Sequence, residues 1–403
     1  MWILSLMLSI PLASANGQSS HLWISEQAIQ RLPEGPLKEI LSDEQFQRQW
    51  RNGTMFPDGG YAVNDAYGEM AHWEPFQRVY LNWIRDTYSP PWSSEAKEHI
   101  AFLMGLASHG LADQSYDAMY FRRAYVYDAE STWEESFDTA TDVAFVAETY
   151  TQATVEIWIP SIVYDIYQQQ GHGVSPSVVE QGQNRLNIAV YWVGNVASQP
   201  ELVSSYIEQY PWGTTHQLDP TVAGTPSMEA DIVVEYWQSL WQILNEGMEH
   251  PLLLFTHPVA NSYQHPRDHE DIESSISMGI SVGINEEQLQ PQHIQVVDAN
   301  GQAHPILVDV FYGNDSHVIN IEPLEDWSIS DFTVILNPEL PLSPNGTLGQ
   351  TLEWTFSTRS EPNINDSNMN DSKTGCASVA SVGTTVWMAW LGCVGSRRRR
   401  SCT

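Results

Sequence analysis

The spacing of apolar residues changes once along this 403-residue chain, near Pro251. Before that point, long segments such as residues 95–112, 134–150 and 229–244 repeat apolar residues every three or four positions, which predicts helices. After it, short runs rich in β-branched residues alternate with turns of Asn, Asp, Gly and Pro. These runs are residues 276–284, 293–297, 306–311, 317–321, 332–336 and 352–356. Strands at this spacing predict a small all-β sandwich.

The expected fold is therefore multidomain, with a mainly α-helical domain over residues 16–250 and an Ig-like β-sandwich over residues 251–360. The last run contains the pattern Trp-x-Phe-x-Thr at 354–358, which resembles the closing strand of bacterial Ig-like domains. A stalk or a carbohydrate contact is the expected role of this domain. The histidines between 257 and 269, with Asp268 and Asp271, could bind calcium, but a solvated linker is the simpler interpretation.

Both ends of the chain have the pattern of targeting segments. Residues 2–12 form a short apolar run before Ala13-Ser14-Ala15, which predicts a signal peptide over residues 1–15. Near the other end, a polar linker at 361–375 precedes an apolar stretch and four arginines. Residues 376–403 are therefore expected to form a membrane-sorting segment whose apolar stretch spans the bilayer. This arrangement resembles myxobacterial C-terminal sorting tails, with Cys376 as the processing point, and a plain anchor is the alternative. A secreted or surface-anchored protein is expected.

The charge of the chain limits its partners. It has 50 acidic and 17 basic residues, and its formal net charge is -33. Such a surface repels phosphate backbones, so binding to nucleic acid through basic patches is not expected. Aromatic residues make up 11% of the chain, which favours a folded protein, because acidic disordered chains contain few of them.

One segment places a histidine and two acids on a single helical face. His109 and Asp113 lie one helical turn apart, and Asp117 extends the same face by another turn. The helix that precedes them is almost wholly apolar, which predicts that it is buried. A buried carboxylate needs a partner, and a metal ion would satisfy both side chains. The alternative is a core helix in which His109 bonds to a backbone carbonyl.

A second acidic row repeats every four residues at Glu130, Glu134, Asp138 and Asp142. Like charges at this spacing repel one another and weaken a helix, so a cation could neutralise them. The spacing alone nevertheless favours a solvated acidic face.

Several short motifs occur together in the helical region. They read Ser-His-Leu-Trp-Ile at 20–24, Phe-Pro-Asp at 56–58, His-Trp-Glu-Pro-Phe at 72–76, Tyr-Ser-Pro-Pro-Trp at 88–92 and Ala-Phe-Leu-Met-Gly-Leu-Ala-Ser-His-Gly-Leu-Ala-Asp at 101–113. This series resembles the zinc-dependent phospholipase C superfamily, and most closely the catalytic domain of glycosylphosphatidylinositol-specific phospholipase D proteins. The resemblance covers residues 18–250 and is densest over 54–117. It implies a helical metal-dependent phospholipase domain that binds two or three zinc ions.

The resemblance also implies a set of ligands. His72, His109 and Asp113 would bind one metal, and Asp113 would bridge to a second metal held by His21. Asp58 would bind metal or position the attacking water, which makes it the expected catalytic residue.

The third metal site departs from the family pattern. Asp117 stands where a histidine is expected, and Glu134 with Asp138, or Asp138 with Asp142, replaces a histidine–acid pair. Carboxylates favour harder ions than zinc, so this site is expected either to hold another divalent ion or to be empty.

These features predict an exported metal-dependent phosphodiesterase that hydrolyses phospholipids by a metal-activated water, with phospholipase C or D regiochemistry left open. Its expected partners are a phospholipid or other phosphodiester substrate and, through the C-terminal segment, a membrane surface. A nuclease of the same superfamily is one alternative. The other is a non-enzymatic surface adhesion protein that keeps structural metal ions.

Overall fold

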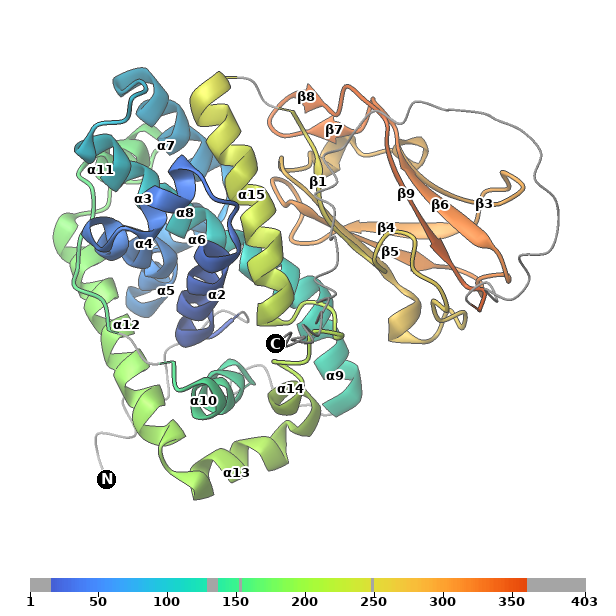
Figure 1. Cartoon of the computed structure of the whole chain (residues 1–403), viewed down its shortest axis with the longest axis horizontal. Helices are drawn as coiled ribbons and strands as arrows, with labels where there is room; N and C mark the ends of the chain where they lie inside the picture. Colours follow the sequence, from blue (N-terminus) through green and yellow to red (C-terminus); the bar gives the residue numbers. More distant parts are fainter. Residues whose placement is uncertain (1–15, 129–136, 152–153, 248–249, 361–403) are drawn as a thin grey trace, which may run out of the picture. The chain divides into compact units, whose positions relative to one another are not determined.

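The computed structural model describes residues 16–128, 137–151, 154–247 and 250–360, and confirms a helical region followed by a small antiparallel β region (Figure 1). The predicted signal peptide, the polar linker, the C-terminal segment and Glu134 lie outside the described residues. Among the described helices, none has both the length and the apolar character that crossing a bilayer requires.

The helical region begins at Gln18 and ends at Glu246. Its elements are α2 (Gln18–Arg31), α3 (Pro36–Ser42), α4 (Glu44–Met55), α5 (Asp58–Val63), α6 (Tyr67–His72), α7 (Glu74–Thr87), α8 (Ser94–Ser115), the π-helix η1 (Tyr116–Phe121), α9 (Arg122–Asp128), α10 (Phe137–Thr149), α11 (Ile162–Gln169), α12 (Pro176–Ala197), α13 (Pro200–Gln209), α14 (Pro211–Thr215) and α15 (Pro226–Glu246). Side-chain caps start several of them: the Ser93 hydroxyl accepts from the Ala96 amide at 3.1 Å, which satisfies one free amide of α8.

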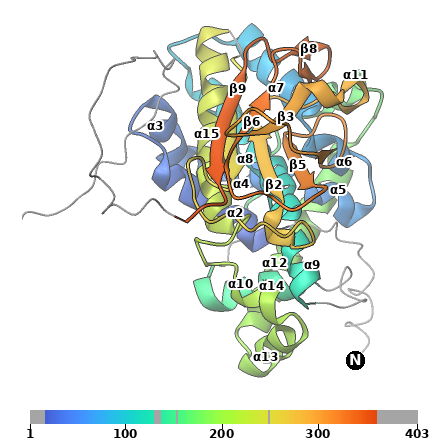
Figure 2. The same cartoon turned by 90° about the vertical axis from the view of Figure 1, so that its right-hand side faces the viewer.

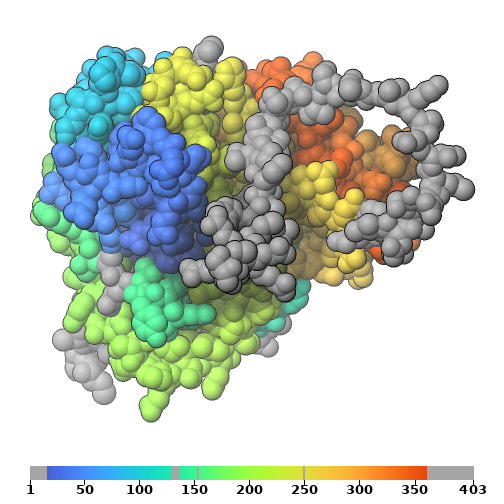
Figure 3. All heavy atoms as spheres, viewed as in Figure 1, coloured from blue at the N-terminus to red at the C-terminus, as the bar shows by residue number. Residues whose placement is uncertain are grey.

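Helix α8 lies at the centre of this region, as its apolar sequence predicts. Every residue from Ile100 to Ser115 is buried, and α4, α7 and α15 pack around it. Gly53 of α4 and Gly105 of α8 allow this packing, because a Cβ on either would overlap backbone oxygens of the other helix. In the views of Figures 1 and 3, α2 lies beside α15. The backbones of α4 and α8 therefore come close enough for the end of α4 to reach His109.

The β region contains two main antiparallel sheets and a small hairpin (Figure 2). The strands are β1 (Leu253–His257), β2 (Ile276–Ile280), β3 (Ile294–Asp298), β4 (Ile306–Val310), β5 (Val318–Pro323), β6 (Asp331–Leu336), β7 (Pro341–Leu342), β8 (Gly346–Thr347) and β9 (Leu352–Ser357). The sheets have the orders β1-β2-β5-β4 and β3-β6-β9, and β7 pairs with β8. Their shared core contains Trp327, Phe332 and, from the predicted closing pattern, Trp354 and Phe356.

The helical and β regions share apolar packing and polar contacts. Leu254, Phe255 and Val318 of the β region belong to the hydrophobic core of the helical region. The buried Arg123 guanidinium on α9 contacts the Glu273 carboxylate at 2.8 Å. The described residues belong to one compact unit, so the change near Pro251 marks a switch of secondary structure within it.

Candidate metal centre

Two histidines face each other at the centre of the helical region. His109 lies on α8, and its Nδ1 is 2.7 Å from the Thr54 carbonyl oxygen at the end of α4. His72 ends α6, and its Nδ1 is 2.7 Å from the Gly68 carbonyl oxygen. A carbonyl can only accept, so each Nδ1 carries the proton and each Nε2 is left as a potential ligand. The two Nε2 atoms are 3.0 Å apart, a separation that requires a proton or a cation between them.

Two carboxylates complete this cluster. Asp113 Oδ2 lies 3.2 Å from His109 Nε2 and 3.4 Å from His72 Nε2. Asp58, the first residue of α5, places Oδ1 3.5 Å from both Nε2 atoms. The four ligand atoms lie within 4.8 Å of one another, and all four residues are buried. Two imidazoles and two carboxylates in this arrangement match the donors that zinc prefers.

His21 joins the cluster from α2 on the other side of Asp113. Its Nε2 is 2.9 Å from Asp113 Oδ1, and its ring stacks on that of His109 with centroids 3.9 Å apart. Among the described residues, neither nitrogen of His21 and neither oxygen of Asp113 has a partner with hydrogen-bond geometry. Buried polar atoms are rarely left in this way, so these four atoms fit a cation better than they fit one another.

The protonation of the cluster follows from burial and from its own charges. Burial alone would lower the pKa of His72 and His109. The Asp113 and Asp58 carboxylates outweigh it and raise the pKa of His72 to about 9 and the pKa of His109 to about 10. Burial and the neighbouring His109 lower the pKa of His21. Burial raises the pKa of both carboxyls, but the histidines lower it well below the usual range. Without metal, a proton shared by His72 and His109 therefore lies where a cation would bind, and metal binding must release it.

A glycine permits this geometry. A Cβ on Gly110 of α8 would overlap the His72 carbonyl oxygen, so only glycine lets α6 lie directly against α8. The expected backbone bond of His109 is also present, but it uses Nδ1 and leaves Nε2 for the cluster. The two interpretations of the His109–Asp113 motif are thus compatible.

Asp117 is buried one turn beyond Asp113, in η1. The Tyr312 hydroxyl donates to its Oδ2, whereas Oδ1 has no hydrogen-bond partner in the described part of the chain. Burial raises the pKa of Asp117 well above its ordinary value, and the charge of Asp113 adds to this. Asp117 is not among the four residues that converge around the two histidines.

The expectation of a solvated acidic face is wrong for Asp138 and Asp142. Both lie on α10 and are buried, with 6% and 4% of their surface exposed. The Asp142 side chain reaches from α10 to the start of α2, where its Oδ1 accepts from the Ser20 amide at 3.3 Å. Burial raises its pKa to about 6, although Ser19 and Ser20 partly oppose this. Helical spacing is the same for a solvated and a buried row, so only the packing against α2 decides between them.

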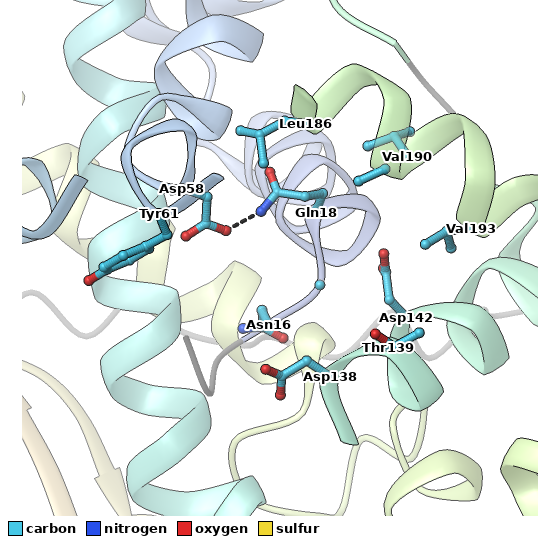
Figure 4. A pocket seen from close by; sticks show the side chains of 12 residues that line it. Asn16, Gln18, Asp58, Tyr61, Asp138, Thr139, Asp142, Leu186, Val190 and Val193 are labelled. Carbon is cyan, nitrogen blue, oxygen red and sulfur yellow. Dashed lines mark hydrogen bonds between the residues drawn. The ribbon is translucent and has the colours of Figure 1, made fainter. Parts of the chain in front are cut away.

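A pocket leads to the cluster at Asp58 (Figure 4). Its polar side contains Asp58 and Gln18, whose amide donates to Asp58 Oδ2. Its apolar side is formed by α12, through Leu186, Val190 and Val193. The pocket is thus apolar along α12, and Asp138 and Asp142 add two further carboxylates to its polar lining.

The sequence motifs did not indicate Asn16, Gln18 or Glu229 as parts of this neighbourhood. Asn16 Nδ2 donates to both carboxylate oxygens of the fully buried Glu229, at 3.2 and 3.0 Å. Burial raises the pKa of Glu229 well above its usual range. A signal was present in the sequence, because Glu229 falls on the same helical face as the apolar Val233 and Tyr236.

Comparison with known proteins relates part of the chain to one group. Mouse phosphatidylinositol-glycan-specific phospholipase D is 34% identical over 133 residues, which are 30% of this chain and 16% of that protein. The rat protein is 30% identical over 159 residues, covering 35% and 19%, and the human protein 29% over 120 residues, covering 27% and 14%. The chain is distantly homologous to these proteins over part of its length. It spans less than a fifth of the length of each.

Other comparisons add no functional argument. No family model matches the chain. Among solved structures, domains 1-6 of the surface layer protein SbsC align over 80% of this chain and 46% of that one, with 9% identity. The TM-score of 0.22 is too low to indicate a shared fold.

Proposed function

We propose that the protein is a metal-dependent phosphodiesterase that hydrolyses phospholipids. One observation carries the proposal: three imidazoles and two carboxylates converge in the core, with facing Nε2 atoms and a buried Asp113 whose oxygens have no hydrogen-bond partner among the described residues. The partial homology to phospholipase D proteins supports the reaction class.

The donor set fits divalent ions. His72, His109, Asp58 and one oxygen of Asp113 would hold one cation, and the other oxygen of Asp113 would share a second with His21. Zinc is the proposed ion, because nitrogen and carboxylate donors suit it. Bound ions of this kind lower the pKa of a coordinated water and offset the negative charge of a phosphodiester.

The residues of the chain divide the remaining work. Asp58 lines the pocket and keeps one oxygen toward the histidines and the other toward Gln18. Its lowered pKa keeps it ionised, so it can orient the attacking water by accepting a hydrogen bond, although the same low pKa makes it a weak base. The apolar wall of α12 would receive the hydrocarbon part of the lipid. Export through residues 1–15 and attachment through residues 376–403 would bring this pocket to a membrane surface.

The test compares substrates and variants of the full chain. The wild-type protein, loaded with zinc, is expected to cleave phosphatidylcholine or another phospholipid in preference to single-stranded DNA. His109→Ala and Asp113→Ala are each expected to abolish turnover and to lower bound zinc, because each removes a ligand from a desolvated cluster. Turnover is measured from the release of the cleaved phosphate ester, and the bound zinc is measured by elemental analysis.

Asp58→Asn separates chemistry from metal loading. It keeps the shape of the side chain but not its charge. Because the amide is also a weaker ligand, the variant is assayed at zinc concentrations that saturate it, and kcat should still fall by about 10²-fold or more, since the attacking water is no longer oriented. Preferential cleavage of DNA would favour the nuclease alternative. Full activity in His109→Ala or Asp113→Ala would exclude this site, and a wild-type chain with fewer than about two tightly bound transition ions would favour an adhesion protein.

A further inference from the structure

Acceptor oxygens dominate the polar lining of the pocket beside Asp58. Three carboxylates line it, those of Asp58, Asp138 and Asp142, and all three residues are buried. No lysine, arginine or histidine in the described part of the chain is among its lining residues. Carboxylates that line a partly buried pocket attract groups of opposite charge, so this pocket favours a cationic ligand.

The side-chain amides that line the pocket already donate elsewhere. Gln18 Nε2 donates to Asp58 Oδ2, and Asn16 Nδ2 donates to both carboxylate oxygens of Glu229. Because Gln18 turns its nitrogen toward Asp58, its Oε1 points away from that carboxylate (Figure 4). Gln18 is only 7% exposed, and its Oε1 has no hydrogen-bond partner among the described residues. A buried acceptor without a partner costs free energy until a donor reaches it, so this oxygen also requires a ligand that donates.

The pocket suits an organic ammonium better than a metal ion. Asp138 and Asp142 belong to no group of three or more convergent ligand atoms within the described ranges. A divalent ion draws its oxygen ligands in to about 2.0–2.6 Å, whereas an ammonium donates over about 2.7–2.9 Å and tolerates more widely spaced acceptors.

The opposite wall distinguishes primary from quaternary ammonium groups. A quaternary ammonium has no N–H and is typically bound by a cage of aromatic rings. The wall on α12 is aliphatic, with Leu186, Val190 and Val193, and the hydroxyl of the pocket's Tyr61 donates to Glu69. A primary ammonium has three N–H donors for the oxygens on the polar side.

We propose that this pocket binds a phospholipid headgroup that carries a primary ammonium, such as ethanolamine, with Gln18 and Asp142 as specificity-determining residues. The ammonium donates to Gln18 Oε1 and to the Asp142 carboxylate, and the phosphate lies at the Asp58 end of the pocket. This inference rests on the proposed function and narrows its substrate class.

The experiment is calorimetric titration of the zinc-loaded full chain with phosphoethanolamine and with phosphocholine, at a pH above the pKa of about 6 of Asp142. The two probes share the phosphate, so the ratio of their Kd values isolates the ammonium end. The wild-type chain should bind phosphoethanolamine about tenfold or more tightly than phosphocholine, because only the former makes charged hydrogen bonds. Glycerol 3-phosphate, whose donors are neutral hydroxyls, should also bind more weakly than phosphoethanolamine.

Two variants test the residues named. Asp142→Asn keeps an oxygen for the Ser20 amide but removes the charge, and Gln18→Leu removes the free acceptor, so each should lower the ratio by about fivefold or more. Any effect of Gln18→Leu through Asp58 acts on the shared phosphate and cancels in the ratio. Asp128→Asn is the matched control, because Asp128 also accepts from amides at a helix start, at 2.7 and 2.9 Å, but does not line the pocket.

The inference is overturned if the wild-type chain binds neither probe, binds both equally, or prefers phosphocholine or glycerol 3-phosphate. It is also overturned if both pocket variants keep the wild-type ratio, or if Asp128→Asn lowers the ratio as much as Asp142→Asn. A chain that shows the expected preference but cleaves no phosphodiester would refute only the proposed function. Cleavage of phospholipids without this preference would refute only the headgroup assignment.

Discussion

The helical and β regions each contain a cluster of one or more histidines with two aspartates, and the two clusters differ in what surrounds them. In the helical region, Asp58, His72, His109 and Asp113 are buried. In the β region, Asp268, His269 and Asp326 are exposed. In both, the potential ligand atoms lie within 4.8 Å of one another. Distance between donors therefore does not distinguish them.

Hydrogen bonding and hydration do distinguish them. Asp326 Oδ1 accepts from both the backbone amide and Nδ1 of His269, at 3.1 and 2.8 Å, so this exposed cluster is already satisfied. Its hydrogen bond to Asp326 raises the pKa of His269, which favours the proton over a metal. In the buried cluster, backbone carbonyls fix the imidazoles through Nδ1, and water does not compete for Nε2. A metal site requires donors that are both oriented and free to bind.

The largest expected effect is on zinc affinity. Asp113→Asn should lower it by about 100-fold or more, because a neutral amide replaces a carboxylate that faces three histidines. Asp326→Asn, the matched change in the exposed cluster, should leave it within about twofold of wild type. Competition with a chromophoric chelator measures both. An equal loss of zinc in the two variants would remove the distinction between the clusters.

An intermediate effect is expected from the helix contact that brings the histidines together. Gly110→Ala should destabilise the fold by about 1–3 kcal/mol, because the added methyl group overlaps the His72 carbonyl and pushes α6 from α8. Zinc affinity should fall with it. Gly173→Ala is the control, since its Cβ would meet nothing within 4 Å. Urea unfolding and zinc titration give the two quantities, and a Gly110→Ala chain as stable as the control would show that the buried cluster tolerates displacement.

The smallest expected effect concerns acid stability at the junction of the two regions. Burial, with the charge of Arg123, lowers the pKa of His257 from 6.5 to about 3. Below pH 6.5, His257 binds a proton in the unfolded chain but stays neutral in the folded chain. The free energy of unfolding should therefore fall as the pH drops from 6.5 toward 3. His257→Gln should reduce the slope of the free energy of unfolding against pH by the amount that corresponds to about one bound proton. Urea unfolding at several pH values measures this slope. An unchanged slope would mean that His257 is not kept neutral by the junction.

Local periodicity predicted most of the fold. The segments 95–112, 134–150 and 229–244 correspond to α8, α10 and α15, because an apolar face every three or four residues is a property of the sequence itself. Strand β1 was not predicted, since Leu253–His257 follows Pro251 without a β-branched run. The short pair β7 and β8 was also missed, because two residues carry no periodic signal.

The site was less predictable than the fold. The motifs indicated Asp58, His72, His109 and Asp113, and the structure brings their side chains together, while their roles as ligands stay predictions. His21 also arrives beside Asp113. The contacts of Tyr312 and Asn16 join positions about two hundred residues apart, and such pairs depend on tertiary packing that no local pattern contains.

The π-helix η1 has a consequence for changes in chain length. A π-helical turn contains one residue more than an α-helical turn, and Arg122 and Arg123, which pair with Glu322 and Glu273, follow it directly. Deleting one residue from Tyr116–Phe121 would rotate α9 by about 100° and shift it by about 1.5 Å. The arginines would turn away from the β region while Asp113 kept its place. Homologous chains that lack this one residue would then need a different set of ion pairs between the two regions. Among homologues, the length of this segment should therefore vary together with the acidic residues of the β region that pair with α9.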